Sequence, residues 1–178
     1  RTGQVARNMI TALFFNRNAI KSGAARPKDV PKWKASKVGI LGAGMMGAGI
    51  AWANATRRIP CVLKDVTLDQ AEKGKAYSAK LLEKRIKQGR SDAAGASQTL
   101  GLIKPTASAD DLAGCDLIVE AVFENRKLKA QVTQEAEPLL APGGFFASNT
   151  STLPITGLAQ ASRNPEKFIG IHFFSPVD

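Results

Sequence analysis

A glycine-rich turn between two apolar segments limits the folds open to this chain more than any other feature. Residues 38–51, VGILGAGMMGAGIA, place Gly42, Gly44 and Gly47 in the spacing G-x-G-x-x-G. Between a strand and a helix, the first glycine permits the tight turn, the second lets backbone approach a pyrophosphate, and the third lets helix pack on strand. The pyrophosphate would bind the free N–H groups at the positive end of the helix. The alternative is a tight strand-to-helix turn that binds nothing.

A carboxylate follows the next apolar run, at the separation that this fingerprint expects. Asp65 comes about 20 positions after Gly42 and could accept hydrogen bonds from the ribose hydroxyls of a dinucleotide. Its charge would repel a 2′-phosphate, so it favours NAD over NADP. Lys64, Arg57 and Arg58 are close enough in sequence to weaken that preference. The alternative for Asp65 is an ordinary surface acid in a turn.

Strand-like and helix-like segments alternate along the rest of the chain. Short apolar runs typical of buried parallel strands occupy residues 38–41, 61–63, 116–121, 144–147 and 168–173. Helices are predicted at residues 46–56, 68–88, 128–140 and 155–161, and residues around Ile103 could form one more short strand. This alternation predicts an α/β fold of the Rossmann type, with a doubly wound, mostly parallel sheet.

The first part of the chain is basic and differs from the rest. Residues 4–20 carry apolar side chains at helical spacing, which predicts an amphipathic helix, and a proline-containing linker follows. Nine basic residues and one acidic residue fall within residues 1–37, so most of the formal net charge of +10 lies there. Only Trp33 stands between basic neighbours, and this is not the repeated interleaving of aromatic and basic residues that a base-stacking groove requires. We interpret the segment as a linker or docking surface and expect no nucleic-acid partner.

Composition excludes other classes of protein. No apolar segment approaches the ~20 residues of a membrane-spanning helix. The chain has one histidine, so a zinc site is not expected. The two cysteines, Cys61 and Cys115, stand at the edges of apolar runs and are predicted to be buried, reduced thiols.

Two polar segments follow predicted strands in the second half of the chain. They are ASNTSTLP, residues 147–154, and HFFSPVD, residues 172–178. In an open parallel sheet both would lie at the carboxyl edge, where ligands bind. His172 could there accept the proton of an alcohol while a hydride leaves the same carbon. The alternatives are a structural histidine at a strand end and, for residues 149–151, a helix N-cap or a glycosylation triplet.

Five segments, in order, resemble the NAD-binding domain of L-3-hydroxyacyl-CoA dehydrogenases. They are VGILGAGMMGAGIA, LKDV, DLIVEAVFENRKLK, FASNTSTLPIT and FIGIHFFSPVD. The LKDV form and the basic leader are most similar to multifunctional fatty-acid oxidation proteins, in which an enoyl-CoA hydratase domain precedes the dehydrogenase. By this resemblance, residues 1–36 would be the last helix and linker of a hydratase-like domain. Residues 37–178 would be the Rossmann domain, without the helical carboxyl-terminal dehydrogenase domain.

The same resemblance implies which residues form the site. His172 would be the base toward the 3-hydroxyl, and Ser151 would hydrogen-bond the substrate oxygen beside the nicotinamide. Glu120, at the end of a predicted strand, is the rival of Glu124 as the cofactor-contacting acid. The residues expected to bind NAD are Gly42, Gly44, Met46, Gly47, Asp65, Glu124, Lys129 and Asn149.

The implied activity is NAD-dependent oxidation of (3S)-3-hydroxyacyl-CoA to 3-ketoacyl-CoA in fatty acid β-oxidation. The implied partners are the acyl-CoA substrate and either further copies of the chain or a thiolase-containing complex. The implied location is the bacterial cytoplasm, or a peroxisome or mitochondrion in a eukaryote. The alternatives are a non-catalytic nucleotide-binding or structural protein, and a Rossmann dehydrogenase for a small β-hydroxy acid.

Two departures from the family pattern limit the activity expected of this chain. Ser175 stands where some members have an asparagine that contacts nicotinamide. The glutamate that orients the family's catalytic histidine would lie beyond Asp178. Because positioning and exclusion of water supply much of a dehydrogenase's rate, we expect NAD binding with little or no turnover.

Overall fold

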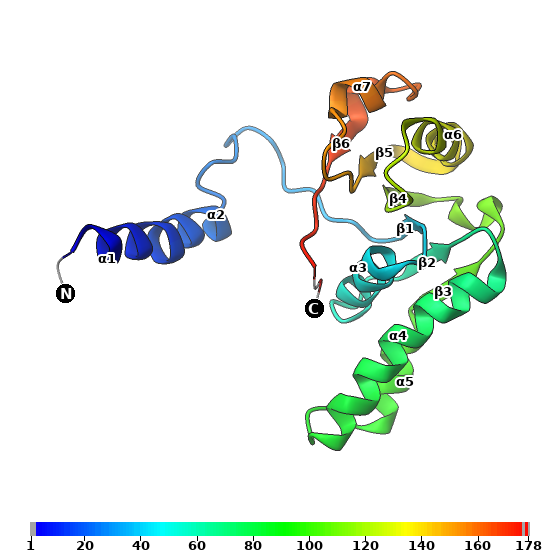
Figure 1. Cartoon of the computed structure of the whole chain (residues 1–178), viewed down its shortest axis with the longest axis horizontal. Coiled ribbons are helices and arrows are strands. Elements are labelled where there is room, and N and C mark those ends of the chain that lie inside the picture. The colour runs from blue at the N-terminus through cyan, green and yellow to red at the C-terminus, as the bar shows by residue number, and fades with distance from the viewer. Residues whose placement is uncertain (1–2, 176, 178) are drawn as a thin grey trace. The chain divides into compact units, whose positions relative to one another are not determined.

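The computed structural model describes residues 3–175 and 177, and the chain divides into two compact units, residues 1–34 and 35–178. The first unit is helical. Its consecutive segments are α1 (Gln4–Met9), the π-helical η1 (Ile10–Asn16) and α2 (Arg17–Ser22) (Figure 1). The helix ends at Gly23, whose φ of 73° is the left-handed conformation that glycine adopts readily.

The second unit contains a six-stranded sheet with every pair of neighbouring strands parallel. The strand order is β3-β2-β1-β4-β5-β6, so the order reverses between β1 and β4. The strands are β1 (Val38–Leu41), β2 (Cys61–Lys64), β3 (Ile103–Thr106), β4 (Cys115–Glu120), β5 (Leu140–Ser148) and β6 (Phe168–Gly170). The predicted α/β class and the extra strand around Ile103 are both confirmed. In such a sheet the carboxyl ends of the two strands at the reversal flank the ligand crevice.

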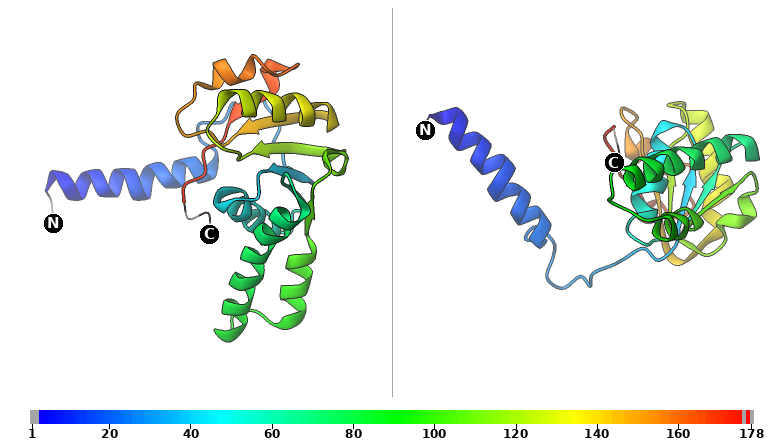
Figure 2. Two further views of the ribbon diagram at one scale, coloured as in Figure 1. Left: turned by 45° about the vertical axis from the view of Figure 1, so that its right-hand side comes forward. Right: turned by 90° about the horizontal axis from the view of Figure 1, so that it is seen from below.

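Helices cover both faces of this sheet (Figure 2). The α-helices are α3 (Met45–Ala55), α4 (Leu68–Lys87), α5 (Ala93–Gly101), α6 (Arg126–Ala136) and α7 (Ile155–Ala159). The 3₁₀ turns are η2 (Ala109–Leu112), η3 (Glu137–Leu139) and η4 (Pro165–Lys167). Among the described residues, no helix combines the length and the apolar character needed to cross a membrane.

Alternate side chains of the strands build a separate core on each face. Ile40 of β1 and Leu63 of β2 pack with Ile50 of α3. Their neighbours Leu41 and Val62 belong to the other core, together with residues of α6, β5 and α7. This alternation is the two-residue period of a strand buried on both faces.

Some element boundaries differ from those predicted. Helix α5 was not predicted, because its sequence AAGASQTLG consists mainly of small residues with little apolar periodicity; the Asp92 carboxylate caps it at the Gly95 N–H, 2.7 Å away. Helix α6 ends at Ala136 and β5 begins at Leu140, because a 3₁₀ turn containing Pro138 separates them. The predicted strand at residues 168–173 is wrong beyond Gly170.

Cys61 and Cys115 are buried free thiols, as predicted. Burial raises the pKa of Cys61 to about 12 and the pKa of Cys115 to about 11. Both side chains therefore remain neutral and contribute to the apolar core.

Candidate functional site

The glycine loop between β1 and α3 is shaped by contacts that leave no room for side chains at two of its three glycines. Gly42 has φ 91°, and a Cβ there would lie 2.8 Å from the carbonyl oxygen of Ala121. A Cβ on Gly47 would lie 1.7 Å from the carbonyl oxygen of Gly42. Gly44 differs, because nothing lies within 4 Å of its Cβ position. The first and third glycines are needed by the protein itself, and the second faces open space that a ligand could approach.

Asp65 lies directly after β2 and bonds to this loop. One of its carboxylate oxygens accepts a hydrogen bond from the Ala43 N–H at 2.6 Å, and the other accepts one from the Val66 N–H at 2.7 Å. Each carboxylate oxygen has a second lone pair, so ribose hydroxyls could still donate to Asp65. The acid thus fixes the loop conformation and remains able to bind a ligand.

The three cations near Asp65 in sequence are separated by the strand. Arg57 and Arg58 precede β2 and lie at its amino end, where the Arg57 guanidinium donates to the carbonyl of Ala53 at 2.9 Å. Lys64, the last residue of β2, pairs with Glu135 of α6, with 3.3 Å between Nζ and Oε1. The prediction that the two arginines could weaken the preference of Asp65 is therefore wrong, because they lie at the opposite edge of the sheet.

A cavity of about 670 Å³ opens between the glycine loop and α6. Its walls include Met46 of α3, Asp65, Phe123, and the apolar side chains Leu128 and Val132 of α6. This volume is within the range typical of small-molecule sites. The cavity joins the loop to the carboxyl ends of β2 and β4, the place where a dinucleotide-binding sheet holds the adenosine half of its ligand.

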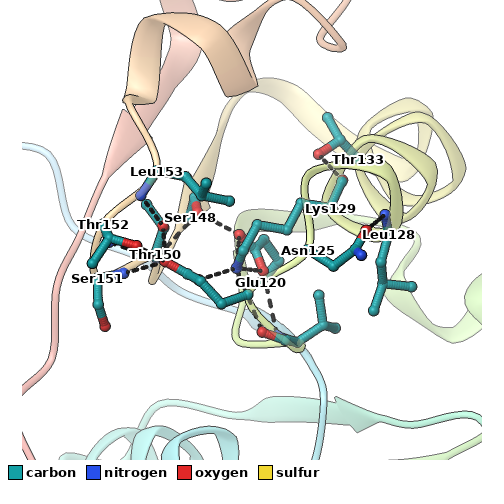
Figure 3. Close-up of polar contacts among 12 residues, drawn as sticks. Glu120, Asn125, Leu128, Lys129, Thr133, Ser148, Thr150, Ser151, Thr152 and Leu153 are labelled. Carbon is teal, nitrogen blue, oxygen red and sulfur yellow. Dashed lines mark hydrogen bonds and ion pairs between the residues drawn. The ribbon is translucent and has the colours of Figure 1, made fainter.

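A buried charge cluster lies on the other side of the sheet reversal (Figure 3). Lys129 Nζ is 2.9 Å from each carboxylate oxygen of Glu120 and 3.3 Å from Oε2 of Glu124. The side chains of Lys129 and Glu120 are only 2% and 1% exposed. The Ser148 hydroxyl also donates to Glu120. Because buried charges must be paired and hydrogen-bonded, these contacts join the ends of β4 and β5 to α6.

Glu124 holds the turn that follows β5. Its Oε1 accepts hydrogen bonds from the Thr150 hydroxyl at 2.5 Å and from the backbone N–H groups of Ser151 and Thr152, each at 3.0 Å. Burial raises the pKa of Glu124, but these hydrogen bonds and the charge of Lys129 outweigh it and lower the pKa to about 2. The carboxylate is therefore ionised and fixes the backbone of residues 150–152.

The same turn contacts the segment that contains the histidine. His172 Nδ1 lies 3.0 Å from the carbonyl oxygen of Thr150, and the Phe173 N–H donates to Asn149 Oδ1 at 2.8 Å. Since a carbonyl oxygen can only accept a hydrogen bond, Nδ1 carries the proton in this contact. In a neutral imidazole the other nitrogen, Nε2, is then free of a proton and can accept one. His172 and Ser151 are both exposed.

The structure brings the predicted catalytic and loop residues to one edge of the sheet. Ser175, in the segment that contains His172, lies with its hydroxyl 3.8 Å from the sulfur of Met45 in the glycine loop. A Cβ on Gly49 of α3 would lie 2.8 Å from Val177 of the same segment. The two polar segments and the glycine loop therefore lie close together at this edge.

Three predicted residues lie where a ligand has little access. Lys129 lies between two carboxylates, Asn149 is 9% exposed, and the rival acid Glu120 is fully buried. Ser148 and Thr150 were not predicted, although the density of hydroxyls in SNTST was a signal that could have identified them. Within the described part of the chain, no three His, Cys, Asp or Glu side chains are grouped to hold a metal ion.

Comparison with known proteins agrees with this geometry. Residues 37–178 match the sequence model of a family described as 3-hydroxyacyl-CoA dehydrogenase, NAD binding domain. The chain is 41% identical over 173 residues to fatty acid oxidation complex subunit alpha of Pseudomonas paraeruginosa. That alignment covers 97% of this chain and 24% of the relative, so the chain spans about a quarter of the length of the curated relatives it matches.

Two solved structures show the same fold. The (S)-3-hydroxybutyryl-CoA dehydrogenase from Ralstonia eutropha has a TM-score of 0.77 and 38% identity, covering 81% of this chain and 51% of that one. The 3-hydroxybutyryl-CoA dehydrogenase from Escherichia coli K12 has a TM-score of 0.77 and 29% identity, covering 82% and 31% of the two chains.

Proposed function

The chain belongs to the family of 3-hydroxyacyl-CoA dehydrogenase NAD-binding domains, and from that premise we propose that it provides the cofactor site for oxidation of (3S)-3-hydroxyacyl-CoA to 3-ketoacyl-CoA in fatty acid β-oxidation. One observation carries the proposal: the open glycine loop and His172 lie at the same edge of the sheet, joined through the contact of Ser175 with Met45. A hydride acceptor and a proton acceptor must meet at one carbon in this reaction.

The residues of the loop fit a dinucleotide. Gly44 caps α3 without a side-chain hydrogen bond, and the space beside its Cβ position is free. The pyrophosphate would bind there, at the N–H groups of the first turn of α3. Asp65 would accept hydrogen bonds from the adenosine ribose, and the adenine would enter the cavity beside Met46.

His172 and Ser151 would act on the hydroxyl group of the substrate. NAD, when bound, accepts a hydride from the carbon that bears the hydroxyl. The contact of His172 Nδ1 with Thr150 leaves Nε2 to take the hydroxyl proton. The exposed hydroxyl of Ser151 would donate to the substrate oxygen and help to orient it.

We assign roles to the remaining predicted residues according to their exposure. Lys129 and Asn149 would act as positioning residues, because one lies between two carboxylates and the other holds the backbone of Phe173. Glu124, whose side chain is 38% exposed, could both fix the turn and contact the cofactor. Glu120 would serve as the internal partner of Lys129.

The names of the relatives support proposals about assembly and location. Because a protein that matches nearly all of this chain is named a subunit of a fatty acid oxidation complex, we infer that the chain works within an assembly. Its partner would be a thiolase subunit or further copies of the chain, and residues 1–36 would connect it to a hydratase-like domain. The bacterial relatives favour the cytoplasm.

Calorimetric titration of the chain with NAD and NADP tests the cofactor site. We expect NAD to bind, NADP to bind more weakly, and Asp65→Ala to lose roughly tenfold or more in NAD affinity, since ribose hydrogen bonds to a charged group are lost. Absence of binding to the folded chain would contradict the proposal.

Measuring turnover in a full-length protein that contains this domain tests the chemistry. There, His172→Gln should lower kcat by about 10²–10⁴ while the affinity for NAD is retained. An unchanged kcat would favour the non-catalytic alternative.

A further inference from the structure

An ion pair forms part of the wall of the cavity that we assign to the adenine of NAD. Lys64 Nζ, at the carboxyl end of β2, lies 3.3 Å from Glu135 Oε1 on α6, and the two side chains are 15% and 42% exposed. Both residues line the cavity. The neighbouring residues of α6 that line it, Leu128 and Val132, are apolar. A hydrogen-bond donor and an acceptor therefore lie side by side in the cavity, and the other side chains of α6 that line it are apolar.

The pair contributes little to stability, so its presence calls for another explanation. A carboxylate as exposed as Glu135 is screened by water, and such pairs are worth about 0–1 kcal/mol. Lys73 also lines the cavity, but its pair with Asp69 is largely exposed to solvent, with side chains 75% and 72% exposed. Lys64 differs from Lys73 because most of its side chain is covered, which restricts the positions that its ammonium can take.

The chemistry of a purine base matches this pair. The edge of adenine presents an exocyclic amino group, which donates, next to a ring nitrogen, which accepts. A carboxylate accepts only and an ammonium donates only, so Glu135 and Lys64 are complementary to that edge. Hypoxanthine has a carbonyl oxygen in place of the amino group, and it would place an acceptor against the Glu135 carboxylate.

We propose that Glu135 and Lys64 determine the base specificity of the cofactor site, with Glu135 accepting from the 6-amino group of adenine and Lys64 donating to the ring nitrogen beside it. The inference rests on the proposed binding of NAD at this edge. The pair would recognise the base of the cofactor, whereas Asp65 would contact its ribose.

Calorimetry with NAD and with nicotinamide hypoxanthine dinucleotide, its deamino analogue, tests the assignment on the full chain. We expect the unmodified chain to bind NAD roughly tenfold more tightly than the analogue, the effect of one hydrogen bond to a charged group. In Glu135→Gln the affinity ratio should fall to about one, because an amide can turn to present either its oxygen or its NH₂ group. Lys64→Met should weaken NAD binding, because the donor to the ring nitrogen is lost.

Asp69→Asn is the matched control, since it removes a carboxylate from the other ion pair of this region and should keep the tenfold ratio. The inference is overturned if the unmodified chain binds both dinucleotides equally, or if the ratio survives in Glu135→Gln. Failure of the folded chain to bind either dinucleotide would instead contradict the proposed function, so the two failures are distinguishable.

Discussion

The two regions of the site are built in opposite ways. Between β1 and α3 the site consists of backbone, and what matters is the absence of side chains at Gly42 and Gly47. Beside β4 and β5 it consists of charged side chains, with Lys129 held among the carboxylates of Glu120 and Glu124. The comparison shows that the first region cannot accept an added atom at Gly42 or Gly47, whereas the second is destabilised by the loss of a charge.

Removal of the central cation should have the largest effect. Lys129→Met leaves the buried carboxylate of Glu120 without its cation, and we expect a loss of about 3–5 kcal/mol in the free energy of unfolding. Urea denaturation measures it. The double variant Lys129→Met, Glu120→Gln should recover part of the loss, because no unpaired charge remains. Lys127→Met, an exposed change on the same helix, is the control. Equal losses in the two lysine variants would show that the charge cluster is not what stabilises this region.

An added methyl group at the glycine loop should have the next largest effect. Gly→Ala inside a helix normally stabilises by about 1 kcal/mol. At Gly47 the sign should reverse, with a loss of about 2–3 kcal/mol, because the new Cβ would collide with the Gly42 carbonyl. Gly44→Ala should change the free energy of unfolding by only about 0.5 kcal/mol. Gly44→Ala should instead lower the affinity for NAD, measured by calorimetry, because the new methyl group would occupy space that we assign to the pyrophosphate. A stabilised Gly47→Ala variant would contradict the close packing of helix on strand.

The glycine loop was easier to predict from the sequence than the charge cluster, because it is built from residues that are close together in the chain. Gly42, Gly47 and Asp65 act through a local strand, turn and helix, so their spacing alone indicated both the fold and the loop. Family comparison confirms the resemblance and the NAD-binding class. The parallel sheet followed from the alternation of elements, whereas α5 was missed because its small residues carry little periodicity.

The charge cluster was not predictable in the same way. Glu120 is nine positions from Lys129 and 28 positions from Ser148, and the three meet only because β4 pairs with β5 while α6 packs across them. Sequence patterns placed Glu124 and Lys129 in the site by resemblance. They could not show that Glu124 binds the turn at Thr150, since that contact depends on the register of distant strands.

Acid should weaken the charged region selectively. The pKa of Glu124 falls from its ordinary value of 4.5 to about 2 on folding, so its stabilising contribution is present above pH 4.5 and is lost as pH falls toward 2. At pH 7, Glu124→Gln should cost about 1.5 kcal/mol, a modest value because water screens this partly exposed side chain. The difference from the unmodified chain should shrink between pH 4.5 and pH 2 in urea denaturation. Glu166→Gln, an exposed carboxylate on η4, is the control. A difference independent of pH would contradict the ionised clamp.

The smallest effect concerns a polar atom on the glycine-loop side of the molecule. Among the described residues, the Ser78 hydroxyl is buried without a hydrogen-bond partner, one turn of α4 beyond Gly74, whose Cβ position lies 2.7 Å from the Ala43 carbonyl. The charged region satisfies its buried groups, whereas this region leaves one unsatisfied. Ser78→Ala should therefore stabilise the chain by about 0.5 kcal/mol more than Ser97→Ala does. Ser97→Ala makes the same change in helix propensity at an exposed position of α5. The difference between the two variants in stability, measured by thermal unfolding, therefore reports on the buried hydroxyl alone. If Ser78→Ala destabilises instead, that hydroxyl has a partner, and the region beside the glycine loop is more polar than its backbone contacts show.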